Sequence, residues 1–238
     1  MIVNLQKEKD WVERYNMSKL IVVEGTDCSG KETQTNLLIE RLKFEKAIIE
    51  KLGFPMYDTP TGKIVGGSYL GKKHISEGLF PEGAANVDPK VAALYYAADR
   101  RYNAYKIREL LDNGYDVLLD CYVESNMGHQ GGKLHTPEER LAMYKWLESL
   151  EYGLLELPRP DLTVFLYMPY QYAVELKKNR QEAPDQHEAS EEHLINAENA
   201  FLELAKLYSF NKVNCVENGI IRTKEDIHEE VYSLVKKR

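Results

Sequence analysis

Short runs of consecutive apolar residues alternate along the chain with longer segments in which apolar residues recur every three or four positions. The apolar runs predict five β-strands, at 20–24, 47–52, 116–120, 162–168 and 212–216. Strands that are apolar on both faces are typical of a parallel sheet covered by helices on each side. We therefore expect an α/β fold, a three-layer α/β/α domain with about five parallel strands.

The segments between these runs carry signals of amphipathic helices. Such patterns occupy residues 32–45, 89–114, 136–153, 190–209 and 223–238. Thr136, Pro137 and Glu139 form a good N-terminal capping arrangement, and Ser190 begins a helix by the same logic. The alternation of runs and helices gives one continuous domain without a linker.

The ends of the predicted strands indicate where a ligand should bind. In open parallel sheets, ligands bind beyond the carboxyl ends of the strands. These ends are Glu24, Asp120 and Met168. We therefore expect the functional residues in the loops that follow these three positions.

Composition and charge narrow the class of protein. The chain has 238 residues, 43% of them hydrophobic and 29% charged, which suits a single globular domain. A net charge of -7 argues against nucleic acid as the main partner. No apolar run approaches the roughly 20 residues that a membrane span needs, and the first residues do not form a signal peptide. The scattered Cys28, Cys121 and Cys215 favour a reducing compartment, so we expect a cytoplasmic protein without a membrane partner.

The stretch "GTDCSGKE", which follows the first strand, nearly matches the phosphate-binding pattern G-x-x-x-x-G-K-[ST]. Gly25 and Gly30 would let backbone N–H groups converge on an anion at the start of a helix. Lys31 would reach the β- and γ-phosphates of ATP and is the first catalytic candidate. The predicted ATP-binding residues are Gly25, Thr26, Asp27, Cys28, Ser29, Gly30, Lys31, Glu32 and Thr33.

Glu32 stands where the pattern requires the hydroxyl that holds Mg²⁺. Its carboxylate could bind Mg²⁺ directly or through water. It could instead point into solvent, where the helix dipole favours an acid. As a third alternative, it could weaken ATP binding enough to abolish turnover. We favour the solvent-facing interpretation and then the metal ligand; Thr33 comes one residue too late to replace the hydroxyl.

Five segments in order resemble the thymidylate kinase family: "VVEGTDCSGKETQ", "FPMYDTPTGKIVGGSYL", "ALYYAADRR", "DCYVESNMGHQGGKL" and "LPRPDLTVFLYMPYQYAVE". The resemblance implies a P-loop NTPase fold and a single kinase domain, 1–238. Within it, residues 1–18 would be an N-terminal extension and about 177–190 a mobile lid. It also implies ATP and Mg²⁺ as cofactors, dTMP as the acceptor and a homodimer.

The same resemblance assigns roles in acceptor binding. Tyr96 would stack on thymine and Arg100 would hydrogen-bond a base carbonyl; at i and i+4 the two share one helix face. Gln130 offers the donor and acceptor that a thymine edge requires. The full predicted acceptor-binding set is Asp27, Phe54, Tyr96, Arg100, Ser125, Gln130 and His187, with His129 beside it.

The catalytic set follows from charge. Family members with a basic loop residue have it where this chain has Cys28, so the lid should supply the cation. Arg180 is the candidate, with Lys177 and Lys178 in reserve. Asp120 could hold Mg²⁺ through water.

Three departures from the family pattern leave the reaction open. Glu32 replaces Ser or Thr, Cys121 replaces an arginine, and Met56 stands where many members place another arginine. The candidates to compensate for the lost charges are Arg100, Arg101, Lys63 and Lys133. Three hypotheses remain: a dTMP kinase, a kinase for another pyrimidine nucleotide or a nucleoside, and a nucleotide-binding protein without turnover.

Overall fold

The computed structural model describes residues 18–177 and 190–237. Its centre is a five-stranded parallel sheet in the order β2-β3-β1-β4-β5. The strands are β1 (Leu20–Gly25), β2 (Ile49–Gly53), β3 (Asp116–Asp120), β4 (Leu162–Tyr167) and β5 (Asn211–Asn214). The predicted parallel sheet is confirmed, with boundaries displaced by two residues or fewer.

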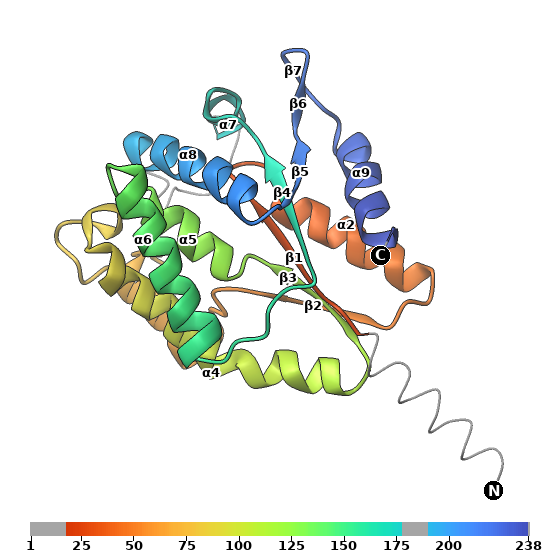
Figure 1. The fold of residues 1–238 in the computed structure, drawn as a ribbon, viewed down its shortest axis with the longest axis horizontal. Helices are drawn as coiled ribbons and strands as arrows, with labels where there is room; N and C mark the ends of the chain where they lie inside the picture. Colours follow the sequence, from red (N-terminus) through yellow and green to blue (C-terminus); the bar gives the residue numbers. More distant parts are fainter. Residues whose placement is uncertain (1–17, 178–189, 238) are drawn as a thin grey trace, which may run out of the picture.

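Helices cover both faces of this sheet (Figure 1). The larger ones are α2 (Lys31–Phe44), α4 (Pro89–Asp112), α5 (Val123–Gly131), α6 (Pro137–Glu148), α7 (Tyr170–Lys177), α8 (Glu191–Leu207) and α9 (Lys224–Lys236). Helices α2 and α9 lie on one face, and α4, α5, α6 and α8 lie on the other (Figure 1). The three-layer α/β/α architecture is therefore confirmed.

The two faces of each central strand belong to different cores. In β1, Leu20 and Val22 pack into a cluster with residues of α4, α5 and α6. Ile21 and Val23 point to the opposite face and pack with residues of α2 and α9. All four are at most 4% exposed, which explains why the strand is apolar throughout instead of alternating.

Several shorter elements join these layers. They are α3 (Pro60–Lys63), the π-helical turns η1 (Ile64–Tyr69) and η3 (Ser149–Leu154), the 3₁₀ turn η2 (Ala84–Asn86), and the strands β6 (Val216–Glu217) and β7 (Ile220–Ile221). Strands β6 and β7 form a separate antiparallel hairpin, so the predicted strand at 212–216 is divided between β5 and β6. The sequence patterns did not predict this hairpin or helix α5.

None of the helices in the described ranges is long and apolar enough to cross a membrane. Residues 1–17 of the predicted N-terminal extension and residues 178–189 of the predicted lid lie outside the described residues.

Candidate active site

The phosphate loop connects β1 to α2 at the carboxyl edge of the sheet. Gly30, the residue before α2, has φ 79° and ψ 25°, a left-handed conformation that favours glycine. A Cβ atom on Gly25 would lie 2.4 Å from Ser29 Oγ and 2.8 Å from the carbonyl oxygen of Leu166, so only glycine fits there. The local sequence therefore forms the tight turn that a phosphate-binding loop needs.

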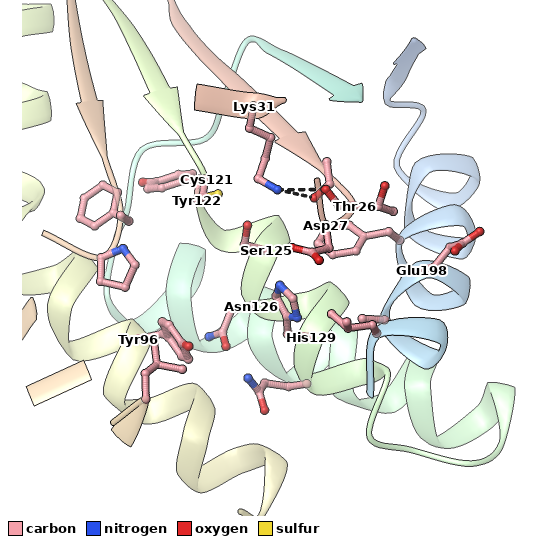
Figure 2. Close-up of a pocket in the computed structure, with 18 of the residues that line it drawn as sticks. Thr26, Asp27, Lys31, Tyr96, Cys121, Tyr122, Ser125, Asn126, His129 and Glu198 are labelled. Carbon is pink, nitrogen blue, oxygen red and sulfur yellow. Dashed lines mark hydrogen bonds between the residues drawn. The ribbon is translucent and has the colours of Figure 1, made fainter. Parts of the chain in front are cut away.

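Lys31 is the first residue of α2, and its side chain folds back over this loop. Its Nζ donates to the carbonyl oxygens of Gly25 at 2.8 Å and Thr26 at 3.2 Å (Figure 2). Burial lowers the pKa of Lys31, but nearby Cys121 and Asp120 and other acidic groups outweigh it, and the net shift is upward. Lys31 therefore carries a full positive charge at the mouth of the loop.

Two contacts fix the loop against neighbouring elements. The Thr26 hydroxyl donates to the carbonyl oxygen of Met168 at 2.7 Å and accepts from the Met168 N–H at 2.9 Å, which ties the loop to the end of β4. Asp27 forms an ion pair of 2.5 Å with Lys177, the last residue of α7. The predicted reserve cation Lys177 thus reaches the phosphate loop.

Glu32 and Thr33 are both exposed on the first turn of α2 and do not line the cavity described below. This position matches the solvent-facing interpretation of Glu32. Two residues further on, the buried Thr35 donates through its hydroxyl to Asp120 Oδ2 at 3.2 Å. Lys51 Nζ lies 3.5 Å from the same oxygen. Asp120 therefore lies beside the start of α2 but is partly engaged by the protein.

One cavity extends from the phosphate loop to an aromatic wall on α4 (Figure 2). Many of the predicted binding residues line it: Gly25, Thr26, Asp27, Lys31, Phe54, Tyr96, Arg100, Ser125, His129 and Gln130. The other predicted loop residues, Cys28, Ser29, Gly30, Glu32 and Thr33, lie outside the lining, as does Asp120. The structure thus joins the phosphate loop and an aromatic wall in a single space.

Helix α5 forms one wall of this cavity, and its N-terminus is capped by a residue that is far away in the sequence. Glu24 at the end of β1 accepts from the N–H groups of Tyr122 at 2.7 Å and Ser125 at 3.1 Å, and also from the Ser125 hydroxyl. Burial raises the pKa of Glu24 to about 7, with the nearby Glu124 adding to the shift. Ser125 therefore lies in the cavity wall with its hydroxyl directed at a buried carboxyl.

The aromatic end of the cavity contains Tyr96, Phe54 and the amide side chains of α5. The Phe54 ring packs 5.9 Å from Tyr122, and the Tyr96 ring contacts Tyr69 edge-on at 5.6 Å. Gln130 is fully buried, and neither atom of its amide has a hydrogen-bond partner among the described residues. A base that enters this end could satisfy both atoms.

Arg100 lines the same end of the cavity, and its charge is matched within the protein. Its Nε and Nη2 donate to the two oxygens of Glu151, and Nη1 donates to the Tyr122 carbonyl oxygen at 3.3 Å. Arg100 is 2% exposed and Glu151 is fully buried. Sequence reasoning found Arg100 but missed Glu151, which no motif segment contains.

Two histidines lie side by side at the far wall. His129 Nδ1 and His193 Nε2 are 3.3 Å apart, and the rings stack with an interplanar angle of 14°. Burial lowers the pKa of His129 to about 4 and that of His193 to about 3. Both rings are therefore neutral near pH 7, and His129 adds no charge to the cavity.

Cys121 and Met56, which replace arginines of the family pattern, bring little charge to this cavity. Cys121 lines it, with burial raising the pKa of its thiol to about 12. Met56 is 7% exposed and packs in the hydrophobic core, so this position does not face the cavity. Lys133 donates to Ala84 and Val87 carbonyl oxygens and does not line the cavity.

Lys63 and Arg101 are exposed and also lie outside the cavity lining. The cations on the described part of the lining are Lys31 and Arg100. Of the four candidates to compensate for the lost arginines, Arg100 alone lines the cavity, within the described ranges. Arg180 and His187, with Lys178, fall outside the described residues, so their predicted roles stay predictions.

Comparison with known proteins decides the family. A sequence profile of the thymidylate kinase family matches residues 23–231. The chain belongs to the thymidylate kinase family. A thymidylate kinase from Schizosaccharomyces pombe is 27% identical over 94% of each chain. A thymidylate kinase from Prochlorococcus marinus is 30% identical over 92% of this chain and 96% of its own.

A solved structure shares the fold. The thymidylate kinase from Candida albicans superimposes with a TM-score of 0.70 at 24% identity, covering 92% of each chain. The P-loop kinase fold predicted from the five segments is thereby confirmed. The family match spans the phosphate loop, α4 and α5, so most of the cavity described above lies within it.

Proposed function

We propose that this thymidylate kinase family member transfers the γ-phosphate of ATP to dTMP and releases dTDP and ADP. One observation carries the proposal: Lys31 and Tyr96 line the same cavity in a chain that matches the family over residues 23–231. Phosphoryl transfer depends mainly on positioning and on charge stabilisation. A single cavity with a phosphate cradle at one end and an aromatic wall at the other provides the positioning.

Each proposed role follows from the chemistry of the residue that would perform it. The loop from Gly25 to Lys31 would cradle the ATP phosphates with backbone N–H groups, and Lys31 would neutralise developing charge on the transferred group. Tyr96 and Phe54 would hold the thymine, and Asp27 would bind the sugar hydroxyl of the acceptor. Arg180 in the lid is the proposed second catalytic cation, with Lys177 already at the loop.

Mg²⁺ is proposed as a companion of ATP. No group of three or more potential metal-ligating side chains occurs within the described residues. Mg²⁺ usually keeps several waters and is bound by one or two carboxylates together with substrate phosphates, so Asp120 would contact the ion through water. The exposed Glu32 is the weaker candidate for such a contact. The ion would supply charge neutralisation to the phosphates.

A nucleoside acceptor is the second candidate function, and one observation favours it. The thiol at Cys121 is uncharged, and Arg100 is already paired with Glu151. An acceptor phosphate would therefore find less positive charge on the described cavity wall than two unpaired arginines would provide. Thymidine, which has no phosphate, would not need that charge.

A homodimer is also proposed, through α4. Val91, Leu94, Tyr102 and Tyr105 on this helix are 42%, 50%, 52% and 57% exposed. Their spacing places them along one side of the helix. An exposed apolar stripe of this kind suits packing against the same helix of a second copy, which size-exclusion chromatography with light scattering would test.

The deciding experiment measures ADP formation by the purified chain with ATP and Mg²⁺, comparing dTMP, dUMP, dGMP, AMP and thymidine with a blank that contains no acceptor. Selective turnover with dTMP is the expected result. Turnover with thymidine but not dTMP would move the assignment to a nucleoside kinase. ATP binding without turnover on any acceptor would contradict both proposals.

A further inference from the structure

Asn126, on α5, has an amide whose orientation is fixed by the protein. Its Nδ2 donates to the carbonyl oxygen of Ala93 at 3.2 Å and to Glu151 Oε1 at 2.9 Å. Both partners are acceptors only, so a reversed amide would place oxygen against oxygen. Hydrogen bonding therefore requires Asn126 Nδ2 to face Ala93 and Glu151.

The other atom of this amide is left for a ligand. Asn126 Oδ1 is buried and has no hydrogen-bond partner among the described residues. Asn126 lines the cavity and lies with Tyr96, Ser125 and His129 around it in Figure 2. A buried carbonyl oxygen without a partner is unfavourable, and an N–H group of a bound base would relieve this. Asn126 can thus present an acceptor to the base, but not a donor.

Gln130, one turn later on α5, has no such constraint. Neither its oxygen nor its nitrogen has a partner among the described residues, so its amide can rotate to suit a donor or an acceptor. Gln130 can match either pattern on a base edge. Discrimination between bases therefore falls to the fixed amide of Asn126 and the fixed donors of Arg100.

Glu151 forms hydrogen bonds with both Asn126 and Arg100. Its Oε1 accepts from Arg100 Nη2 at 2.6 Å and from Asn126 Nδ2 at 2.9 Å, while Oε2 accepts from Arg100 Nε. Arg100 has five N–H donors, and three are engaged by Glu151 and Tyr122 among the described residues. The fully buried carboxylate therefore fixes a donor and an acceptor side by side at the aromatic end of the cavity.

Glu151 reaches this position through the backbone. It lies on η3, a π-helical turn that continues α6. Single π-helical turns of this kind occur often at functional sites.

We propose that Glu151 is the positioning residue that makes the acceptor site selective for a base with an N–H beside a carbonyl, as in thymine or uracil, over cytosine. Thymine offers N3–H to Asn126 Oδ1 and its O4 to an Arg100 N–H. Cytosine offers an acceptor at N3 and a donor at N4, so both contacts become unfavourable. The inference rests on the proposed function, because it takes this cavity as the acceptor site.

The test compares binding instead of turnover, so that it does not depend on transfer. Calorimetric titration gives the dissociation constants of dTMP and dCMP, and the readout is their ratio. Wild-type protein should bind dTMP at least roughly tenfold more tightly than dCMP. Glu151→Gln should bring the ratio towards one, because the amide has one acceptor oxygen: if that oxygen keeps Arg100 Nη2 and Asn126 Nδ2, the amide nitrogen meets Arg100 Nε donor to donor, and if it turns to Arg100 Nε, the nitrogen meets Asn126 Nδ2 instead. A merely structural role for Glu151 would weaken both ligands equally and leave the ratio unchanged.

Two further variants keep the result interpretable. Glu151→Asp retains the charge that the buried Arg100 needs and should fold if Glu151→Gln does not. Its carboxylate is one methylene shorter and should not reach both partners, so its ratio should fall between the other two. The matched control is Glu124→Gln, another buried carboxyl, which accepts from the Tyr152 hydroxyl at 2.6 Å and should keep the wild-type ratio.

The outcomes separate the two proposals. An unchanged ratio in both Glu151 variants, or an equal loss in Glu124→Gln, overturns the role of Glu151. A wild-type protein that binds dTMP and dCMP equally overturns it as well. Strong preference for dTMP in binding without phosphate transfer would contradict the proposed function and leave the inference about Glu151 standing.

Discussion

Glu24 is a buried acid with a strongly raised pKa, and replacing it with glutamine gives a quantitative prediction. The residue is fully buried at the end of β1, where burial raises its pKa from 4.5 to about 7. In Glu24→Gln, Oε1 can still accept from the N–H groups of Tyr122 and Ser125, since both bonds go to Oε1 in the wild type. The amide nitrogen can donate to the Ser125 hydroxyl. The substitution therefore removes the titration and keeps most of the geometry.

The expected effect depends on pH in one direction. Below pH 4.5 the carboxyl is protonated in both the folded and the unfolded chain and contributes no pH dependence. Between pH 4.5 and about 7 the unfolded chain has released the proton and the folded chain still holds it. Rising pH therefore favours unfolding in this window, by about 1.4 kcal/mol per pH unit. Above about pH 7 the full loss, about 3 kcal/mol, is present.

The assay is urea unfolding of wild type and Glu24→Gln at pH 5, 6, 7 and 8. The free energy of unfolding of the variant, minus that of the wild type, should increase by roughly 2.5 kcal/mol between pH 5 and 8, since a small part of the loss is already present at pH 5. Other titrating groups are common to both proteins and cancel in this difference. A difference that does not change with pH would refute the reasoning, because it would mean that Glu24 is ionised throughout and acts as a charged cap of α5.

Three other predictions follow from the same site. Lys31→Met should lower kcat for ATP-dependent transfer by roughly a hundredfold or more, with a melting temperature near that of the wild type; unchanged kcat would remove Lys31 from the catalytic set. Cys28, which is half-buried in the phosphate loop, should react with iodoacetamide faster than Cys215 and more slowly once ATP is bound, as peptide mass spectrometry would measure. Burial raises the pKa of the Cys215 thiol to about 12, and equal rates would show that the loop is not a formed cradle. Burial lowers the pKa values of His129 and His193, so wild type should lose stability as the pH falls from 6.5 towards 4, whereas His129→Phe should lose less. Identical acid profiles for the two proteins would contradict that assignment.

The sequence predicted the sheet because its strands are buried on both faces. Residues such as Val22 and Val23 point in opposite directions and are both fully buried, so the apolar run has no gap. The phosphate loop could also be predicted from the sequence, because its glycine spacing and Lys31 are local features. In the structure, Gly30 has φ 79°, a left-handed conformation that favours glycine and forms the tight turn of the loop.

Helix α5 was missed because its signals are not local. Its N-cap residue Tyr122 makes no side-chain capping bond, and the cap comes from Glu24, 98 residues earlier. Gly128 resembles a loop residue in the sequence. In the structure a Cβ there would lie 2.6 Å from the Phe201 ring, so the glycine serves helix packing. Long-range contacts of this kind cannot be read from one short window.

The partners within the cavity were missed for the same reason. Glu151 lies in a segment that reads as an ordinary amphipathic helix, and its charge suggests a solvated face. The π-helical turn and the buried Arg100 place it in the core instead. Met56 could be recognised as a departure from the family pattern, but its burial in the core depends on packing that the sequence does not encode locally.

The measurement that tests the central claim most directly follows the phosphate itself. Purified protein is incubated with Mg²⁺, γ-labelled ATP and dTMP, and the labelled products are separated by chromatography. The account predicts that the label moves into dTDP, and that Lys31→Met slows this transfer by roughly a hundredfold or more. Label that remains in ATP, or that appears only as inorganic phosphate, would contradict the assignment of this protein as a dTMP kinase.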